Sequence, residues 1–224
     1  MFRRRSRSEP DETELPDDEP SGRQSDLQSD RQSDLQSGEQ SRGTGGPWDS
    51  DSLPDDGVER VDLGSIRVPP PEGVELRLQV DEATGAVQSV MLAAEDGALE
   101  LRAFAAPRNG DLWSDVRPQI AADISRHGGT ATEREGRWGT ELVCRMQVVL
   151  PDGTQALQPS RIIGVNGARW LLRGTFLGQP AVEPEEAQDW EDALASVVVH
   201  RGGHAMPVGD ALPLVLPDDA QRLT

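Results

Sequence analysis

Residues 161–178 read RIIGVNGARWLLRGTFLG and decide the fold of this chain. Two apolar runs flank Asn166-Gly167, and Asn-Gly is strongly preferred in two-residue hairpin turns because both turn residues must accept positive φ. The sequence therefore predicts antiparallel strands over 155–165 and 168–177, joined at Asn166-Gly167. A lone hairpin is barely stable in water, so other strands or helices must pack against it.

A turn at Asn166-Gly167 also predicts the register of the hairpin. The expected cross-strand pairs are Val165 with Ala168, Ile163 with Trp170, and Arg161 with Leu172. These residues share one face with Gly174 and Phe176, which we expect to be the core face. The opposite face would carry Ile162, Gly164, Arg169, Leu171 and Arg173, with Gly164 opposite Arg169.

Five further segments are predicted strands, namely 74–80, 87–93, 99–105, 130–135 and 142–148. Among them, 74–80, 99–105 and 142–148 alternate apolar and polar residues, the pattern of half-buried strands. Short turn sequences such as Glu95-Asp96-Gly97 and Pro151-Asp152-Gly153 separate neighbouring strands and favour antiparallel hairpins.

Two segments have helical periodicity. Leu112, Val116, Ile120 and Ile124 recur every fourth residue before Gly128-Gly129, which predicts an amphipathic helix. Pro118 fits its first turn if the helix proper starts near Asp115; otherwise the helix kinks there.

The second helix would begin at Pro184, because proline is favoured at the first helical position. Its core-facing stripe would be Ala187, Trp190, Leu194, Val197 and Val198. Residues 197–199 could instead form a short strand.

This order of elements predicts an α+β fold: a single antiparallel sheet of about seven strands with two packed helices. The domain would span residues 58–201. Residues 202–224 carry three prolines and would wrap around it as an extended arm. Residues 1–57 would be a disordered acidic tail of low complexity.

The tail contains an octad repeat, RQSDLQSD at 23–30 and RQSDLQSG at 31–38. One leucine per octad cannot offset the entropy of ordering the chain. We therefore expect a solvated tail, with folding on a partner as the alternative. It has a basic tip at 3–7 and an acidic block at 9–19, and it could be a solubilising extension or a tether to a basic partner.

The overall charge restricts the classes of partner. The formal net charge is −18, which disfavours unspecific binding to nucleic acids or anionic membranes, although a local arginine patch could still bind an anion.

One cysteine, Cys144, allows no internal disulfide and no cysteine zinc cluster. No apolar run suits a membrane span, and the basic start lacks the apolar region of an export signal. We expect a cytoplasmic protein without cofactors.

Arg169 and Arg173 are the candidate binding residues of the hairpin. On one strand their Cα atoms would lie about 13 Å apart, too far for a tight clamp on one carboxylate. They could pair with neighbouring carboxylates, bind an anion or acidic partner, or lie under the C-terminal arm. Trp48 is the third candidate, because it could anchor the linker to the domain or contact a partner.

No catalytic or metal-ligating set is predicted. Phosphate-loop, dinucleotide and nucleophile-elbow motifs are absent from the sequence. Cys144 falls on the apolar face of its strand and is expected in the core. His200 and His204 have ligand-like spacing, but Gly202-Gly203 between them argue against a helix. Salt bridges explain Glu133, Glu135 and Glu141 near Arg134 and Arg137 as well as acid–base roles do.

Six segments together resemble a family of actinobacterial proteins of unknown function. They are Gly46-Pro47-Trp48-Asp49, 61–65 (VDLGS), 103–107 (AFAAP), 139–142 (GTEL), 164–174 (GVNGARWLLRG) and 199–202 (VHRG). The resemblance covers residues 46–217. This chain has Ala168 where the family usually has proline, and Trp48 where a tyrosine is usual.

The resemblance implies a cytoplasmic protein without an established activity, often encoded beside dUTPase. The order of strands and helices is also similar to that of PsbP proteins and Mog-type Ran-binding proteins, which are mostly binding and assembly factors. Fold alone does not determine function.

The sequence thus favours a non-enzymatic module that binds or assembles proteins, and it leaves the oligomeric state open. The alternative is a small-molecule or anion-binding domain that uses the arginine face, possibly a degenerate enzyme. A concave site with convergent polar groups would favour the alternative, and a flat face would favour protein binding.

Overall fold

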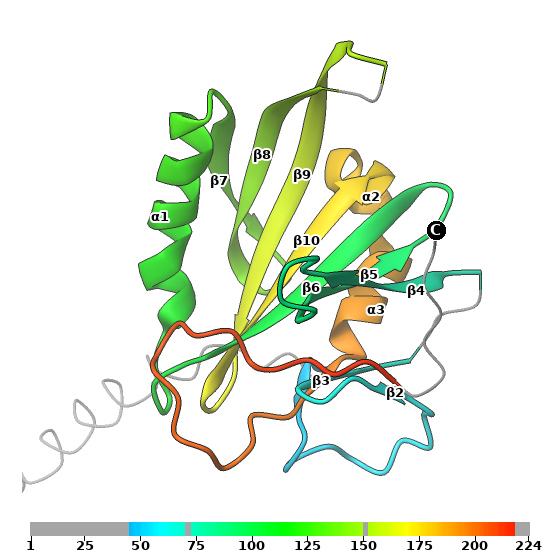
Figure 1. Cartoon of the computed structure of the whole chain (residues 1–224), viewed down its shortest axis with the longest axis vertical. Coiled ribbons are helices and arrows are strands. Elements are labelled where there is room, and N and C mark those ends of the chain that lie inside the picture. The colour runs from blue at the N-terminus through cyan, green and yellow to red at the C-terminus, as the bar shows by residue number, and fades with distance from the viewer. Residues whose placement is uncertain (1–44, 70–72, 150–151, 218–224) are drawn as a thin grey trace, which may run out of the picture. The chain divides into compact units, whose positions relative to one another are not determined.

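The computed structural model describes residues 45–69, 73–149 and 152–217. Residues 1–44 of the predicted tail, with the repeat at 23–38 and the charged segments before it, lie outside the described residues. All seven predicted strands are present and form one antiparallel sheet in the order β4-β5-β6-β10-β9-β8-β7 (Figure 1). Their bounds are β4 Glu75–Val80, β5 Val87–Ala93, β6 Gly97–Ala105, β7 Thr130–Gly136, β8 Gly139–Val149, β9 Gln155–Asn166 and β10 Trp170–Gly178. The predicted α+β class is confirmed.

The β9–β10 hairpin forms with a different turn. Leu172 pairs with Val165, and Phe176 pairs with Arg161. The Gly167 amide donates a hydrogen bond to the Trp170 carbonyl oxygen at 2.7 Å, so the tight turn is Ala168-Arg169. The predicted turn at Asn166-Gly167, and with it the pairing of Gly164 with Arg169, is wrong.

The side chain of Asn166 explains the difference. Its amide nitrogen donates to Asp111 Oδ1 at 2.7 Å, and its oxygen accepts from the Trp113 backbone amide at 3.2 Å. Asn166 therefore belongs to β9 and binds the start of a helix. The turn moves by two residues, so each side chain keeps its predicted face.

The sheet buries apolar side chains on both faces. The predicted core face carries Ile163, Trp170 and Leu172 in the larger cluster. On the other face, Ile162 and Leu171 are buried together with Cys144 beneath α1 (Leu112–Arg126). The predicted core positions of Trp170 and Cys144 are confirmed. The face that was expected to carry the binding arginines is thus half covered by a helix.

Helix α1 begins at Leu112 with Asp111 as its N-cap, so of the two alternatives for Pro118 the one with a helix start near Asp115 is wrong. The N-cap carboxylate accepts from the Ser114 amide at 3.0 Å, which stabilises the earlier start. Pro118 lies inside the helix, on its exposed side.

The second predicted helix, which was to begin at Pro184, is divided into two pieces, the 3₁₀ helix η1 (Pro184–Glu186) and α3 (Gln188–Ala195). A further short helix that was not predicted, α2 (Gln179–Val182), precedes them. The predicted stripe is buried throughout, from Ala187 to Val198. The alternative of a strand at its end is also present, because Val198–Val199 forms β11.

A small second sheet was not predicted. It has the order β1-β11-β3-β2, where β1 is Trp48–Asp49, β2 is Val61–Asp62 and β3 is Ile66–Val68. The Trp48 amide donates to the Val197 carbonyl oxygen at 2.8 Å. Strand structure thus begins before the predicted domain start at residue 58, because β1 pairs in parallel with β11.

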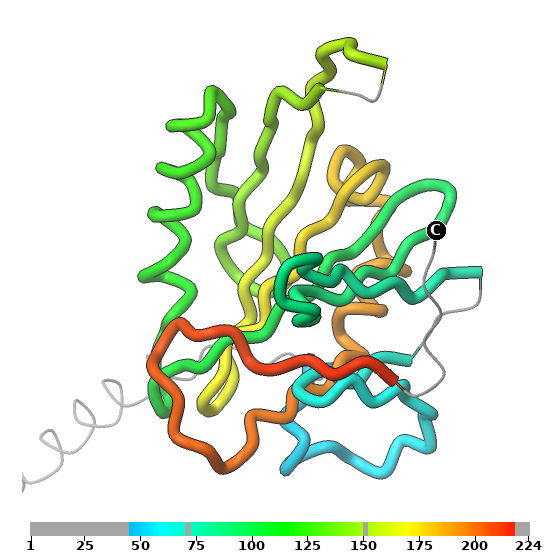
Figure 2. Tube along the Cα trace, viewed as in Figure 1, coloured from blue at the N-terminus to red at the C-terminus, as the bar shows by residue number. Residues whose placement is uncertain are grey.

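The described part of the C-terminal arm runs beside β6 and β3. The Leu212 amide donates to the Ala103 carbonyl oxygen at 2.8 Å, and the Val215 amide donates to that of Leu63 at 3.0 Å. Figure 2 shows this arm in red as it passes the end of β6. The arm occupies the part of β6 that β5 leaves unpaired. No helix of the described residues is long and apolar enough to cross a membrane.

Candidate functional site

A groove of about 580 Å³ lies between α1 and the sheet. Helix α1 supplies one wall with Val116, Ile120 and Ile124, and the strands supply Ser160, Arg173 and Thr175. The groove exists because α1 packs on β7, β8 and β9 and leaves the neighbouring part of the sheet face uncovered (Figure 1). A volume of this size is typical of small-ligand sites.

Two arginines meet at one side of this groove. Arg173 on β10 is directly opposite Arg102 on β6. Both guanidinium groups lie over the ring of Phe104, at 5.5 Å for Arg173 and 5.7 Å for Arg102. The Nε atoms of both are buried and lack a hydrogen-bond partner among the described residues.

The electrostatic surroundings of Arg173 are unfavourable to its charge. Burial lowers the pKa of Arg173, the positive charge of Arg102 lowers it further, and Glu100 opposes both effects. Like charges directly opposite each other on paired strands are destabilising. The fold nevertheless keeps this pair half-buried, with hydrogen-bonding capacity left over.

The α1 wall is held in place by one glycine and one tryptophan. A Cβ atom on Gly164 would lie 2.1 Å from the Trp113 ring, so only glycine lets the indole lie on β9. The Trp113 indole nitrogen donates to the Thr140 carbonyl oxygen at 2.7 Å. This contact and the bonds of Asn166 fix the start of α1 against the hairpin.

The cap residue Asp111 belongs to the same junction. Partial burial raises its pKa, but hydrogen bonds from Ser114 and Asn166 outweigh this effect, and the pKa lies below its ordinary value. The carboxylate is therefore charged at neutral pH and complements the helix N-terminus.

The structure does not bring the three candidate residues together. Arg169 lies in the hairpin turn, and its guanidinium donates to the Gly202 carbonyl oxygen at 3.4 Å. Trp48 lies in β1, and its neighbour Asp49 accepts from the indole of Trp170 at 2.8 Å. Only Arg173 lines the groove.

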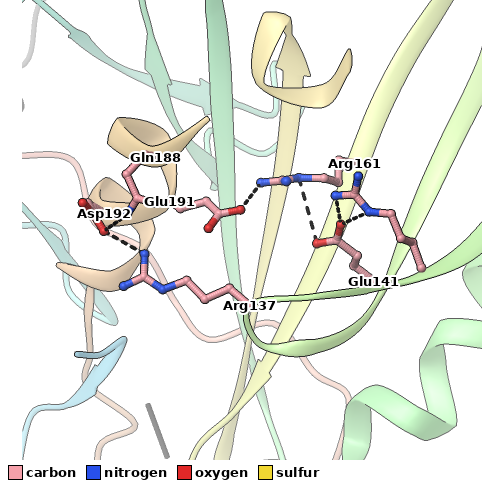
Figure 3. A network of polar contacts seen from close by, with 7 residues as sticks. Arg137, Glu141, Arg161, Gln188, Glu191 and Asp192 are labelled. Atoms are coloured by element: carbon pink, nitrogen blue, oxygen red, sulfur yellow. Dashed lines mark hydrogen bonds and ion pairs between the residues drawn. The ribbon is translucent and has the colours of Figure 1, made fainter. Parts of the chain in front are cut away.

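A second polar cluster lies on the opposite face of the sheet (Figure 3). Arg161 on β9 is only 1% exposed, and it donates to Glu191 of α3 at 2.7 Å. Glu141 on β8 is paired with Arg134 and lies 4.0 Å from Arg161. The guanidinium of Arg161 also lies 4.6 Å from the centre of the Phe176 ring.

This cluster is balanced in charge, because two arginines meet two glutamates. Beside it, Arg137 pairs with Asp192 at 2.7 Å. The predicted explanation of Glu141 by salt bridges is confirmed. We assign the cluster to the attachment of α3, whereas the Arg102–Arg173 pair lacks such partners.

Sequence reasoning found Arg173 but not Arg102 or Arg161. A signal existed for Arg161, because it was placed on the core face of β9, where a charged residue needs a buried partner. Arg102 could not be recognised, since its pairing with Arg173 depends on two strands that are far apart in sequence.

A family model described as "Protein of unknown function (DUF3710)" matches residues 46–223. No curated protein matches the chain at the level of sequence.

Two solved structures are similar in fold. The first is a protein from Bacteroides thetaiotaomicron VPI-5482, with 14% identity, a TM-score of 0.37, and coverage of 64% of this chain and 48% of that one. This chain thus spans about half the length of that protein. The second is the solution structure of cyanobacterial PsbP (CyanoP) from Synechocystis sp. PCC 6803, with 12% identity, a TM-score of 0.36, and coverage of 63% and 92%. We draw no functional argument from either.

Proposed function

This chain belongs to the DUF3710 family of proteins of unknown function, and we propose that it is a non-enzymatic protein that binds a small anion in the α1 groove. The observation that carries this proposal is the pair of Arg102 and Arg173. They are directly opposite each other, half-buried, and without an ion pair among residues 45–69, 73–149 and 152–217.

A bound anion would offset the free-energy cost of burying the positive charges of Arg102 and Arg173 side by side. Burying a charge without a partner costs free energy, and charge-assisted hydrogen bonds from arginine to a carboxylate or phosphate are strong. The groove places Arg173 at its wall, where a ligand can reach it. The hydroxyls of Ser160 and Thr175 line the same groove and can donate further hydrogen bonds.

The shape of the site favours an anion over a protein surface. The protein-binding module predicted from the sequence was to use an Arg169/Arg173 face or Trp48. The Arg169 guanidinium instead donates to the Gly202 carbonyl oxygen, and the backbone amide of Trp48 pairs with Val197, away from Arg173 and the groove. What remains at Arg173 is a concave site, which supports the anion-binding alternative.

Isothermal titration of the full chain with inorganic phosphate and with acetate tests the proposal. We expect weak but saturable binding of at least one anion, and a loss of about tenfold or more in affinity in R173Q, because a charge-assisted hydrogen bond contributes about 1.5–3 kcal/mol. R102Q should lose less affinity, because Arg102 lies beside Arg173 but does not line the groove. Arg145 is an exposed arginine of β8 outside the groove, so R145Q is the matched control and should bind as the wild type does. Equal affinity in all variants, or no binding by the wild type, would refute the proposal.

A further inference from the structure

The groove has two walls of different chemistry. Apolar side chains line much of it: Val116, Ile120 and Ile124 from α1, and Met146, Ile162 and Leu177 from the strands. Charged and hydroxyl groups gather near Arg173. We infer that the ligand is amphipathic, a monoanionic carboxylate with a linear alkyl chain of medium length. This inference rests on the proposed function.

The charges beside the groove favour a single negative charge on the ligand. Arg102 and Arg173 contribute two positive charges, and Glu100 lies close enough to offset one of them. Asp123 and Arg126 also line the groove, but they pair with each other at 2.8 Å. One positive charge therefore remains for the ligand.

The apolar wall favours an alkyl chain beyond the head group. Val116, Ile120, Met146 and Leu177 remain partly exposed in the structure. A chain that follows α1 would cover them and bury its own methylene groups. Each methylene group that is fully buried increases affinity by about fourfold at most.

The test compares carboxylic acids of increasing chain length with two control compounds whose head groups are neutral or positively charged. Binding of acetate, hexanoate and decanoate, below micelle-forming concentrations, is measured by calorimetry on the full chain. Decanol and decyltrimethylammonium carry the same chain without a negative charge. The proteins are wild type, R173Q, I120Q and V208Q, where Val208 is an exposed valine outside the groove. Circular dichroism verifies that each variant is folded.

We expect the affinity to rise by at least tenfold from acetate to decanoate in the wild type and in V208Q. In I120Q this rise should shrink by at least threefold. In R173Q all acids should bind more weakly, and decanol and the ammonium compound should bind poorly to every protein.

Two results would overturn the inference in different ways. If acetate or phosphate binding depends on Arg173 but the affinity is the same for every chain length, the anion site stands and the amphipathic ligand is wrong. If decanoate binds no better than decanol, or binds R173Q as tightly as wild type, the chain adsorbs to apolar surface, and this result argues against both proposals.

Discussion

At the scale of single residues, the buried Arg161 and the half-buried Arg173 have opposite surroundings. Arg161 has Glu141 and Glu191 within ion-pair distance, whereas Arg173 has Arg102 opposite it on β6. A charged side chain that is satisfied within the fold supports stability. One that is left unsatisfied beside a groove is typical of a binding site.

This contrast predicts opposite effects of the same substitution. R161Q should lower the free energy of unfolding by about 3–5 kcal/mol, because it leaves two glutamates without their buried partner. R173Q should leave the free energy unchanged or raise it, because it removes a like-charge pair. Urea denaturation at pH 7 measures both. A clear loss of stability in R173Q would show that Arg173 has a structural role.

At the scale of elements, apolar patterns and turn sequences together predicted all seven strands but not the position of the turn between the last two. The apolar pattern of Ile163, Trp170 and Leu172 indicates which face of the sheet each side chain occupies. A shift of the hairpin turn by two residues leaves every side chain on the same face, so this pattern cannot locate the turn. Asn166-Gly167 satisfied every local criterion for a turn. The requirement that overrode it, a bond from Asn166 to the cap of α1, involves a segment more distant in the sequence.

The junction between α1 and β9 should be sensitive to a single methyl group. In G164A the new Cβ would lie 2.1 Å from Trp113, so the indole must move and α1 must shift. We expect a loss of about 1–3 kcal/mol in the free energy of unfolding, together with weaker anion binding. Gly174 is the control, since a Cβ there would lie 3.3 Å from its nearest neighbours. G174A should be clearly milder, and equal losses would contradict the assigned role of Trp113.

The cap of α1 should also respond to pH. The pKa of Asp111 is lowered in the folded protein, so its stabilising effect is complete above the pKa of the unfolded chain, about 3.9. The effect is lost as the pH falls through the lower, folded pKa. D111N keeps an oxygen acceptor but does not titrate. Urea midpoints of D111N should therefore fall less between pH 6 and pH 2.5 than those of the wild type, and parallel falls would contradict this.

At the scale of the whole molecule, the sequence predicted the large sheet but missed the small one. The strands β1, β2 and β11 have two residues each, too few for any alternation to be visible. Their partners also lie far apart in the chain, as with Trp48 and Val198. The groove was missed for the same reason, because its walls come from α1 and from the strands β6, β8, β9 and β10.

Two truncations test how much of the N-terminal region supports the fold. Removal of residues 1–44 should leave the urea midpoint unchanged, because the composition of that region offers little apolar surface to bury. Removal of residues 1–50 also takes away β1 and the acceptor that Asp49 provides for the indole of Trp170. We expect the second truncation to lose at least about 1–3 kcal/mol, the usual cost of an unsatisfied buried donor. Equal midpoints would show that β1 is dispensable.

The position of the C-terminal arm has a consequence for the order of folding during synthesis. The centre of the large sheet forms late, because β6 pairs with β10, from Ala105 with Trp170 to Gly97 with Gly178. On its other edge β6 pairs with β5 up to Leu101, and residues 209–212 cover the rest of that edge at Ala103 and Ala105. A ribosome-bound chain that ends before residue 209 therefore presents this edge to chaperones or to other nascent chains. During translation, this edge of β6 therefore stays open to other chains until the C-terminal arm has left the ribosome.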